Sequence, residues 1–306
     1  MKKIPLVVVA GATASGKTSL AIQIAKEFNG EVVSADSMQI YKYMDIGTAK
    51  PTIEEMEGIP HHLIDIVTPD VNFSVADYCD MAHSVISDIT KRGKLPILTG
   101  GTGLYINSVV NDVEFEEADK DEKLRAELLE LAKENGAEAL HKILEEIDPV
   151  SAEKIHANNI KRVIRAIEVF KTTGEKLSEH NEKSAEIESR YNPVMMEILW
   201  DREKLYERID RRVDIMIEQG LEQETKKLYE MGYTKDLTSM QGIGYKEMFQ
   251  CFDGVWTFSQ AIDKIKQYSR NYAKRQNTWF KRDDRIVRLN PEEDYIKNAF
   301  KIIREC

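Results

Sequence analysis

Near the N-terminus, a lysine and a threonine follow a glycine in an order typical of phosphate binding. Residues 11–18 read Gly-Ala-Thr-Ala-Ser-Gly-Lys-Thr, which fits the P-loop pattern G-x-x-x-x-G-K-[ST]. In such a loop the backbone N–H groups surround a phosphate, the lysine adds positive charge, and the threonine hydroxyl coordinates Mg²⁺. The pattern therefore predicts that Mg²⁺ binds at Thr18 and that a phosphate or diphosphate binds at Gly11, Ala12, Thr13, Ala14, Ser15, Gly16, Lys17 and Thr18.

A carboxylate is the second residue with obvious chemistry. Asp36 ends the short apolar segment 31–35, and ligands of open α/β sheets bind beyond the carboxyl ends of the strands. A second glycine-rich turn, 100–105, follows the apolar segment 94–99 and is expected at the same sheet edge. Apart from Asp36, no apolar strand in this half ends in the aspartate that P-loop NTPases use for Mg²⁺. A motor or switch NTPase is therefore disfavoured, whereas small kinases and other diphosphate chemistry stay open.

Strands that alternate with helices must position these residues. Ser74 with Asp77 predicts a capping box for a helix that runs to about residue 92, and residues 19–25 predict the helix after the P-loop. The sequence thus predicts an α/β fold with a P-loop NTPase-like parallel sheet flanked by helices and interrupted by a small all-helical domain. Apolar runs predict strands at 6–10, 31–36, 61–67, 94–99 and 192–200.

The change of pattern from residue 114 to 190 predicts the inserted helical domain. Apolar residues recur there at helical spacing, so the chain divides into a P-loop core, 1–113 plus 191–306, and an insertion, 114–190. On the predicted helix 159–172, Lys161, Arg162 and Arg165 can share one face. From these residues alone, a solvated face with ion pairs is the preferred interpretation.

The C-terminal half adds further basic residues. Asp201 is expected to cap a helix over 202–219, which carries Arg208 and Arg212 one turn apart. A second predicted helix, 262–280, combines charges with flat rings. It is equally compatible with an RNA surface and with an amphipathic helix whose aromatic side chains lie in the core. Its basic residues and aromatics are Lys266, Arg270, Lys274, Lys281, Arg282, Tyr268, Tyr272, Trp279 and Phe280.

Composition excludes several classes of protein. The net charge of -10 over 306 residues excludes a global attraction to nucleic acid and leaves only local basic patches. The three cysteines are far apart, which indicates a reducing compartment rather than a disulfide framework. The adjacent His61 and His62 would point to opposite faces of a strand, so a metal site is disfavoured there. With no signal peptide or membrane-spanning run in the sequence, we expect a cytoplasmic protein without membrane association.

Six phrases of the sequence resemble, in order, the bacterial tRNA dimethylallyltransferases, also called tRNA isopentenyltransferases of the IPP transferase family. The resemblance runs from about residue 5 to 282, and six ordered phrases are far more specific than one. Ala12 stands where the family more often has proline, and since the backbone binds the phosphate we expect no loss of function. The phrases are residues 11–18, 34–41, 100–105, 155–166, 242–246 and 275–280.

The resemblance implies transfer of a dimethylallyl group from dimethylallyl diphosphate to N6 of the adenosine next to the anticodon of tRNA. It implies Mg²⁺ as cofactor, the anticodon stem-loop as partner of the insertion, and a monomer. Catalytic roles fall to Asp36, Thr102 and Lys17, and diphosphate contacts to the P-loop with Arg208 and Arg212. The implied tRNA contacts are Asp36, Ser37, Met38, Gln39, Thr102, Arg125, Lys161, Arg162, Val163, Ile164, Arg165, Gln241, Gly242, Ile243, Gly244, Tyr245 and Lys246.

Three other functions remain open from the residues. A small-molecule or nucleotide kinase would use the same P-loop with ATP. A prenyltransferase that acts on free AMP should lack the helical insertion and the basic C-terminal helix, both of which the sequence contains. A non-catalytic RNA- or nucleotide-binding protein would not need Asp36 and the 100–105 turn at one sheet edge.

Overall fold

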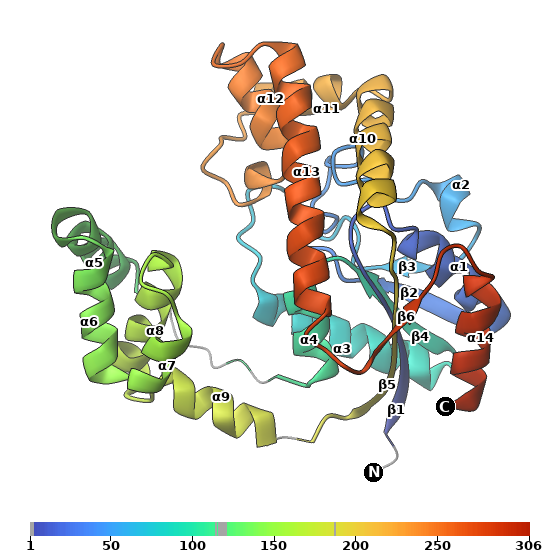
Figure 1. The fold of residues 1–306 in the computed structure, drawn as a ribbon, viewed down its shortest axis with the longest axis horizontal. Coiled ribbons are helices and arrows are strands. Elements are labelled where there is room, and N and C mark those ends of the chain that lie inside the picture. The colour runs from blue at the N-terminus through green and yellow to red at the C-terminus, as the bar shows by residue number, and fades with distance from the viewer. Residues whose placement is uncertain (1–2, 114, 116–120, 187) are drawn as a thin grey trace. The chain divides into compact units, whose positions relative to one another are not determined.

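The computed structural model describes residues 3–113, 115, 121–186 and 188–306 (Figure 1). They form two compact units, one within 1–110 and 190–306, the other within 111–189. We call these the α/β unit and the helical unit. The sequence-based boundaries were placed at 113/114 and 190/191, and residue 114 lies outside the described residues.

The α/β unit is organised on a parallel sheet with strand order β3-β2-β4-β1-β5-β6. Strand β1 lies between β4 and β5, with Val9 opposite Thr99 and Met196. Because every pair is parallel, the carboxyl ends of β1, β2 and β4 meet at one edge of the sheet. The strands are β1 (Ile4–Ala10), β2 (Gly30–Ser34), β3 (His61–His62), β4 (Leu95–Gly100), β5 (Tyr191–Ile198) and β6 (Ile286–Leu289).

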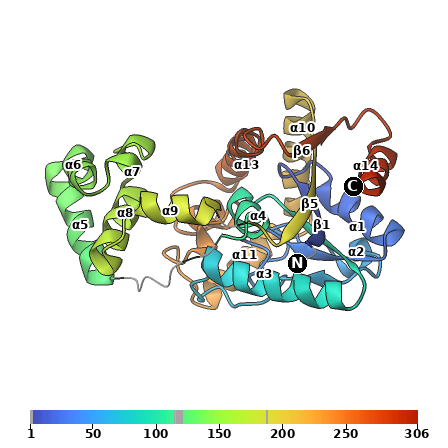
Figure 2. The ribbon, with the colours of Figure 1, turned by 90° about the horizontal axis from the view of Figure 1, so that it is seen from below.

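Helices cover both faces of this sheet (Figure 2). Helices α1 (Lys17–Glu27) and α14 (Tyr295–Glu305) pack with Val7, Val9 and Met196 in one apolar cluster. Since side chains alternate along a strand, the intervening residues face the other side. There α3 (Val75–Lys91) contacts β2 and β4, and α4 (Gly103–Val110) contacts β1 and β4.

The remaining helices of this unit lie beyond the carboxyl ends of the strands or beside them. Helices α10 and α13 pack against each other through apolar side chains such as Leu205, Ile209 and Ala273. No helix within the described residues is both long and apolar enough to span a membrane. The bounds are α2 (Ile53–Met56), α10 (Arg202–Glu218), α11 (Leu221–Glu230), the 3₁₀ helix η1 (Ser239–Gln241), α12 (Tyr245–Phe252) and α13 (Phe258–Phe280).

Two local predictions need correction, whereas the capping box predicted at Ser74 is confirmed at the start of α3. The strand expected over 61–67 ends after His62, because Leu63 and Asp65 adopt positive φ values of 62° and 55° that a strand cannot contain. Asp201 stands at the N-cap of α10, but its side chain makes no capping hydrogen bond.

The helical unit has its own apolar core. Leu140, Leu144, Val163 and Ile167 are fully buried in it. The buried carboxylate of Asp148 joins two helices: it accepts hydrogen bonds from the N–H groups of residues 151 and 178, both at 3.0 Å. The helices are α5 (Glu122–Asn135), α6 (Ala137–Ile147), α7 (Pro149–Lys154), α8 (Ile160–Thr173) and α9 (Leu177–Glu186).

Candidate active site

The P-loop leads from β1 into α1 through residues in the left-handed region. Ala14 has a φ of 61° and Gly16 a φ of 98°, and glycine adopts that conformation without the strain that a Cβ would cause. Gly16 is the N-cap of α1, so the N–H groups of the loop and the positive end of the helix meet there. Residues 11–18 therefore have the backbone geometry of an anion-binding loop.

Side chains from distant parts of the chain hold this loop. The indole Nε1 of Trp200, just after β5, donates to the carbonyl oxygen of Ser15 at 2.8 Å. Gln276, on α13, accepts a hydrogen bond from the N–H of Thr13 at 2.9 Å. Thr13 lines the cavity with this N–H already bonded, and its predicted contact with the diphosphate stays a prediction.

Both arginines singled out on α10 reach the P-loop. The Nε of Arg208 donates to the carbonyl oxygen of Ala14 at 2.9 Å, and its guanidinium lies 4.4 Å from the ring centroid of Trp200. The Nη1 of Arg212 is 3.4 Å from the hydroxyl oxygen of Thr13. These contacts leave several guanidinium N–H donors available for an anion in the loop.

Lys17 lies among these cations. Loss of solvent around the ammonium, together with the positive charge of Arg212, lowers the pKa of Lys17 to about 8, although Asp36 opposes the shift. Its Nζ is 3.3 Å from the carbonyl oxygen of Ala12. A bound diphosphate favours the charged form of an amine. An anion in the P-loop would therefore stabilise the ammonium form of Lys17.

Asp36 and Thr102 come together at the ends of β2 and β4. The Oδ1 of Asp36 accepts the N–H of Met38 at 2.9 Å, which fixes the carboxylate, while its Oδ2 receives no hydrogen bond from the residues that the structure describes. The Thr102 hydroxyl accepts the N–H of Ser37 at 3.0 Å and lies 3.3 Å from the Ser37 hydroxyl. One carboxylate oxygen is therefore available to accept a proton.

One cavity connects the P-loop and Lys17 with Asp36 and both α10 arginines. It has a volume of about 1150 Å³ and is lined by the P-loop, Asp36, both α10 arginines and the loop 45–52. Ligand pockets typically measure about 300–1,000 Å³, so this cavity has room for an allylic diphosphate together with a nucleobase. It presents cations around the P-loop and a carboxylate at the end of β2.

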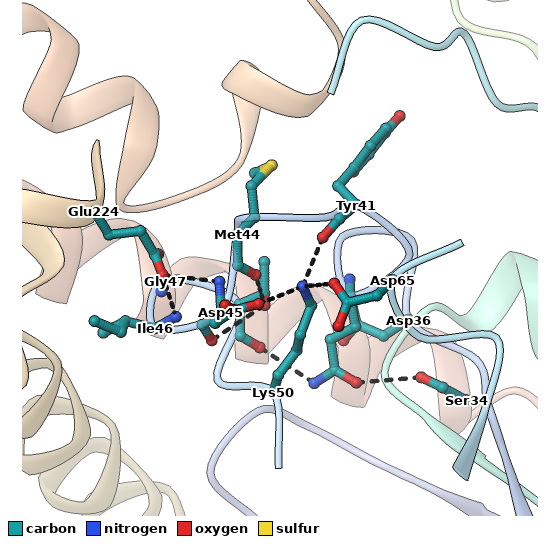
Figure 3. Close-up of polar contacts among 12 residues, drawn as sticks. Ser34, Asp36, Tyr41, Met44, Asp45, Ile46, Gly47, Lys50, Asp65 and Glu224 are labelled. Carbon is teal, nitrogen blue, oxygen red and sulfur yellow. Dashed lines mark hydrogen bonds and ion pairs between the residues drawn. The ribbon is translucent and has the colours of Figure 1, made fainter. Parts of the chain in front are cut away.

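The loop 45–50 forms one wall of the cavity and is fixed from two directions (Figure 3). The carboxylate of Glu224, from α11, accepts the three backbone N–H groups of residues 45–47 at 2.9, 2.8 and 3.1 Å. The Lys50 ammonium donates to the carbonyl oxygen of Tyr41 at 2.6 Å and to the carboxylate of Asp65. This wall is therefore formed before any ligand binds.

Gln39 serves that same loop. The Nε2 of Gln39 donates to the carbonyl oxygens of Thr48 and Ala49, both at 3.2 Å, and its Oε1 lies 3.2 Å from the Ser34 hydroxyl. Both amide hydrogens are thus used inside the protein. Gln39 also lines the cavity, so its predicted contact with tRNA stays a prediction while its amide positions the cavity wall.

Known proteins share both the sequence and the fold. Residues 39–283 match the family model described as IPP transferase. The chain belongs to this family. A tRNA dimethylallyltransferase of Acetivibrio thermocellus is 54% identical over 288 residues, which cover 94% of this chain and 92% of that protein. A tRNA dimethylallyltransferase of Bacillus cytotoxicus is 54% identical over 276 residues, which cover 90% of this chain and 87% of that protein.

Solved structures agree with this assignment. The full-length tRNA isopentenylpyrophosphate transferase of Bacillus halodurans is 47% identical, with a TM-score of 0.74 over 99% of this chain and 95% of that one. A eukaryotic dimethylallyltransferase acting on tRNA is 32% identical, with a TM-score of 0.82 over 97% of this chain and 77% of that one. The resemblance read from six phrases and the predicted fold class are confirmed.

The segment 241–246 of this IPP transferase has a divided role. Residues 241–243 line the cavity, and Lys246 is exposed. Tyr245 is fully buried, and its hydroxyl donates to the Glu224 carboxylate at 2.7 Å. Tyr245 also lines the cavity and anchors the residue that holds its wall, and its predicted contact with tRNA stays a prediction.

In the helical unit, some of the residues predicted to contact tRNA are exposed and others are buried. Lys161 and Arg162 are exposed at the start of α8. Val163 and Ile164 are 0% and 7% exposed and belong to the apolar core. The prediction that these two side chains contact tRNA is wrong, because helical periodicity turns them inward.

Arg125 and Arg165 converge on one buried carboxylate. The Nε and Nη2 of Arg125 donate to the two oxygens of Glu168 at 2.7 and 2.9 Å, and Nη1 of Arg165 donates at 2.7 Å. Burial alone would raise the pKa of Glu168, yet the hydrogen bonds from both arginines lower it below its ordinary value. These arginines stabilise the unit internally, and their contact with tRNA stays a prediction.

The basic face of α13 is partly neutralised. Lys266 forms an ion pair with Asp214 at 2.6 Å, and Arg270 pairs with Asp210, both acids being on α10. Phe280 is 1% exposed and lies in the core. Part of the basic face of α13 therefore serves the packing of α13 against α10.

Helix α13 also contributes side chains to the cavity, a placement that the sequence alone does not give. Tyr272, Arg275 and Gln276 line the cavity. Burial raises the pKa of Tyr272 to about 12. The four-residue spacing of Tyr272 and Gln276 on one helix face was the available signal, but it does not reveal what lies opposite that face.

The residues around Thr18 fit Mg²⁺ that arrives with a diphosphate. Thr18 lines the cavity next to the P-loop, and Mg²⁺ commonly keeps several waters and uses few protein oxygens besides substrate phosphates. Within the described residues, no group of three or more His, Cys, Asp or Glu side chains could hold a metal by itself. A magnesium site here depends on the diphosphate for most of its ligands.

Proposed function

We propose that this IPP transferase family member is a tRNA dimethylallyltransferase. It transfers the dimethylallyl group from dimethylallyl diphosphate to N6 of the adenosine 3′-adjacent to the anticodon (position 37) in tRNAs that read codons beginning with U, and releases diphosphate. One observation carries the proposal: a single cavity contains a P-loop with Lys17 and two arginines as well as the carboxylate of Asp36. The names of relatives that are 54% identical support it.

The chain's own residues fit each part of this reaction. The N6 lone pair attacks the allylic carbon, the new carbon–nitrogen bond forms as the carbon–oxygen bond breaks, and the bonding electrons leave with the diphosphate. Lys17, Arg208 and Arg212 stabilise the charge that grows on the departing oxygen. The available Oδ2 of Asp36 accepts the proton that N6 loses, and the Thr102 hydroxyl lies beside the acceptor. When bound at Thr18, Mg²⁺ supplies additional charge neutralisation to the diphosphate.

The acceptor must enter the cavity as an extruded base. Enzymes that modify a nucleobase take it out of its stack, and Ser37 and Met38 beside Asp36 would contact the flipped adenine. The exposed Lys161 and Arg162 are suited to the phosphates of the anticodon stem-loop. We further propose that the protein acts as a monomer in the cytoplasm, where its tRNA substrate is found.

A labelling experiment tests the activity. The protein is incubated with Mg²⁺, labelled dimethylallyl diphosphate and an unmodified tRNA that has three adenosines after the first two anticodon bases. We expect label in the RNA, and none when guanosine replaces the adenosine at position 37. Label found only on AMP would indicate the AMP-directed prenyltransferase, and phosphate transfer from ATP would indicate a kinase; either result would overturn the proposal.

A further inference from the structure

A single buried amide joins the two glycine-rich loops of the cavity. The Oε1 of Gln276 accepts the N–H of Thr13 in the P-loop at 2.9 Å, and its Nε2 donates to the carbonyl oxygen of Gly101 at 2.9 Å. Gln276 is 5% exposed and belongs to α13 rather than to either loop. A carboxamide carries an acceptor and a donor on one carbon, whereas a carboxylate only accepts and a thioether does neither well. The bridge therefore depends on the amide.

Helix α13 holds this amide firmly. Ala273 and Phe280, three residues before and four after Gln276, are 0% and 1% exposed, so the same helix face is packed on both sides. One turn earlier on the same helix, the largely buried Tyr272 lines the cavity beside Gln276. Little freedom remains for the amide to move without moving the loops.

The two loops have different roles in the proposed reaction. Thr13 belongs to the loop that would hold the departing diphosphate. Gly101 precedes Thr102, whose hydroxyl bonds Ser37 beside Asp36. We infer that Gln276 is a positioning residue that sets the spacing between the diphosphate loop and the acceptor side of the cavity; this inference rests on the proposed prenyl transfer. Since reacting atoms must lie about 3–3.5 Å apart, an error in that spacing would slow the chemical step more than the binding of either substrate.

Gly101 offers a way to disturb the bridge from its other end. A Cβ at Gly101 would lie 2.2 Å from the Nε2 of Gln276, while its other neighbours are 3.4 Å away. Its φ lies outside the positive region where glycine is needed. Gly101→Ala should therefore displace the amide without straining its own backbone.

Two substitutions of Gln276 test the inference through steady-state kinetics. Gln276→Met keeps the length and removes both hydrogen bonds, so kcat should fall about 10–100-fold, with KM for donor and for tRNA changed less than about threefold. Gln276→Glu should lose a similar factor at neutral pH, because a carboxylate repels the Gly101 carbonyl oxygen. Its kcat relative to wild type should rise as the pH falls, since a protonated carboxyl can donate again.

The pH comparison is made as a ratio to wild type because other groups near the amide also titrate. They are Tyr272 on the same helix and, around the P-loop, Lys17 and Arg212; the Asp36 carboxylate faces the same cavity. The matched control is Gln267→Glu on the same helix, an exposed position outside the cavity, which should leave the ratio flat. Gln276→Met should show no recovery at low pH.

The outcomes separate this inference from the proposed function. A wild-type protein that does not prenylate tRNA would overturn the proposed function. An active wild type with Gln276→Met within about threefold of its kcat would overturn the inference alone. If thermal unfolding shows that Gln276→Met has lost its fold, the decision passes to Gly101→Ala and to the pH ratio of Gln276→Glu. Near-wild-type kcat in Gly101→Ala, or a flat ratio in Gln276→Glu, would then contradict the bridge.

Discussion

The two units of the molecule use arginine in opposite ways. In the α/β unit, Arg208 and Arg212 contact P-loop oxygens and line a cavity with donors to spare. In the helical unit, Arg125 and Arg165 both donate to Glu168, whose side chain is 0% exposed. The P-loop arginines therefore surround a site for an external anion. The arginines of the helical unit are already paired with a carboxylate of the protein, that of Glu168.

This difference shows what a basic pattern in a sequence leaves undetermined. Spacing places cations on one helix face, but the nearest carboxylate decides whether they serve a ligand or the fold. A charge-assisted hydrogen bond to a buried carboxylate cannot be given to a phosphate without leaving that carboxylate unpaired. The comparison therefore predicts catalytic losses in the α/β unit and stability losses around Glu168.

The largest effect is expected at the carboxylate of the α/β unit. Asp36→Ala should lower kcat roughly 10²–10⁴-fold, the usual range for a general base, with tRNA affinity changed far less. Asp36→Asn is the matched variant, because its amide oxygen can still accept the N–H of Met38. Single-turnover rates should be low in both variants. Near-normal turnover in Asp36→Asn would remove this residue from proton transfer and leave it a structural role.

Replacement of Lys17 should cause the next largest loss of activity and should change how activity depends on pH. Its pKa is about 8, against an ordinary value of 10.5, chiefly because of desolvation. The free enzyme therefore loses this positive charge as the pH rises through about 8, and kcat/KM for the donor should fall above that pH. Lys17→Met should lower kcat/KM by roughly 10²–10³ and remove this alkaline limb. A limb that persists unchanged in Lys17→Met would show that another group causes it.

Much of the catalytic region could be anticipated from the sequence. The P-loop is a local motif whose strand, turn and helix are adjacent in the chain, and the rule for carboxyl ends of parallel strands brought Asp36 and Thr102 to it. The bridge from Gln276 to Thr13 spans 263 positions. No periodicity carries information on such a pairing, which depends on how α13 packs across the sheet edge.

The errors have a common physical cause. The pair at 163–164 was assigned to tRNA because it lies in a phrase of the family, yet its side chains belong to the apolar core. Gln39 and Tyr245 lie in such phrases too, and their polar groups are bonded inside the protein. A phrase can recur because it builds a wall as well as because it touches a substrate. β6 was missed because four residues give too short a pattern to distinguish a strand from a loop.

Glu168 tests the stability side of the comparison. Glu168→Gln removes the charge that two arginines share and should lower the free energy of unfolding by about 1.5–3 kcal/mol, the range for a hydrogen bond to a charged group. Because its folded pKa is below the ordinary 4.5, the contribution is complete above that pH and is lost as the pH falls further. Urea unfolding at pH 7 and pH 4 measures both effects. The exposed Glu127→Gln on α5 is the control and should change stability little.

The smallest effect is expected where exposed cations of the helical unit meet RNA. Replacing Lys161 and Arg162 together with alanine should weaken tRNA binding about tenfold and lower the slope of log K against log salt by about 1.5, as expected for two lost phosphate contacts. Donor binding and the melting temperature should stay unchanged, because both side chains are exposed on α8. Arg125→Ala should do the reverse and lower the melting temperature first, since it leaves Glu168 one partner short. If the double variant bound tRNA with an unaltered salt slope while Arg125→Ala altered it, the division between ligand-facing and fold-facing cations would be reversed in this unit.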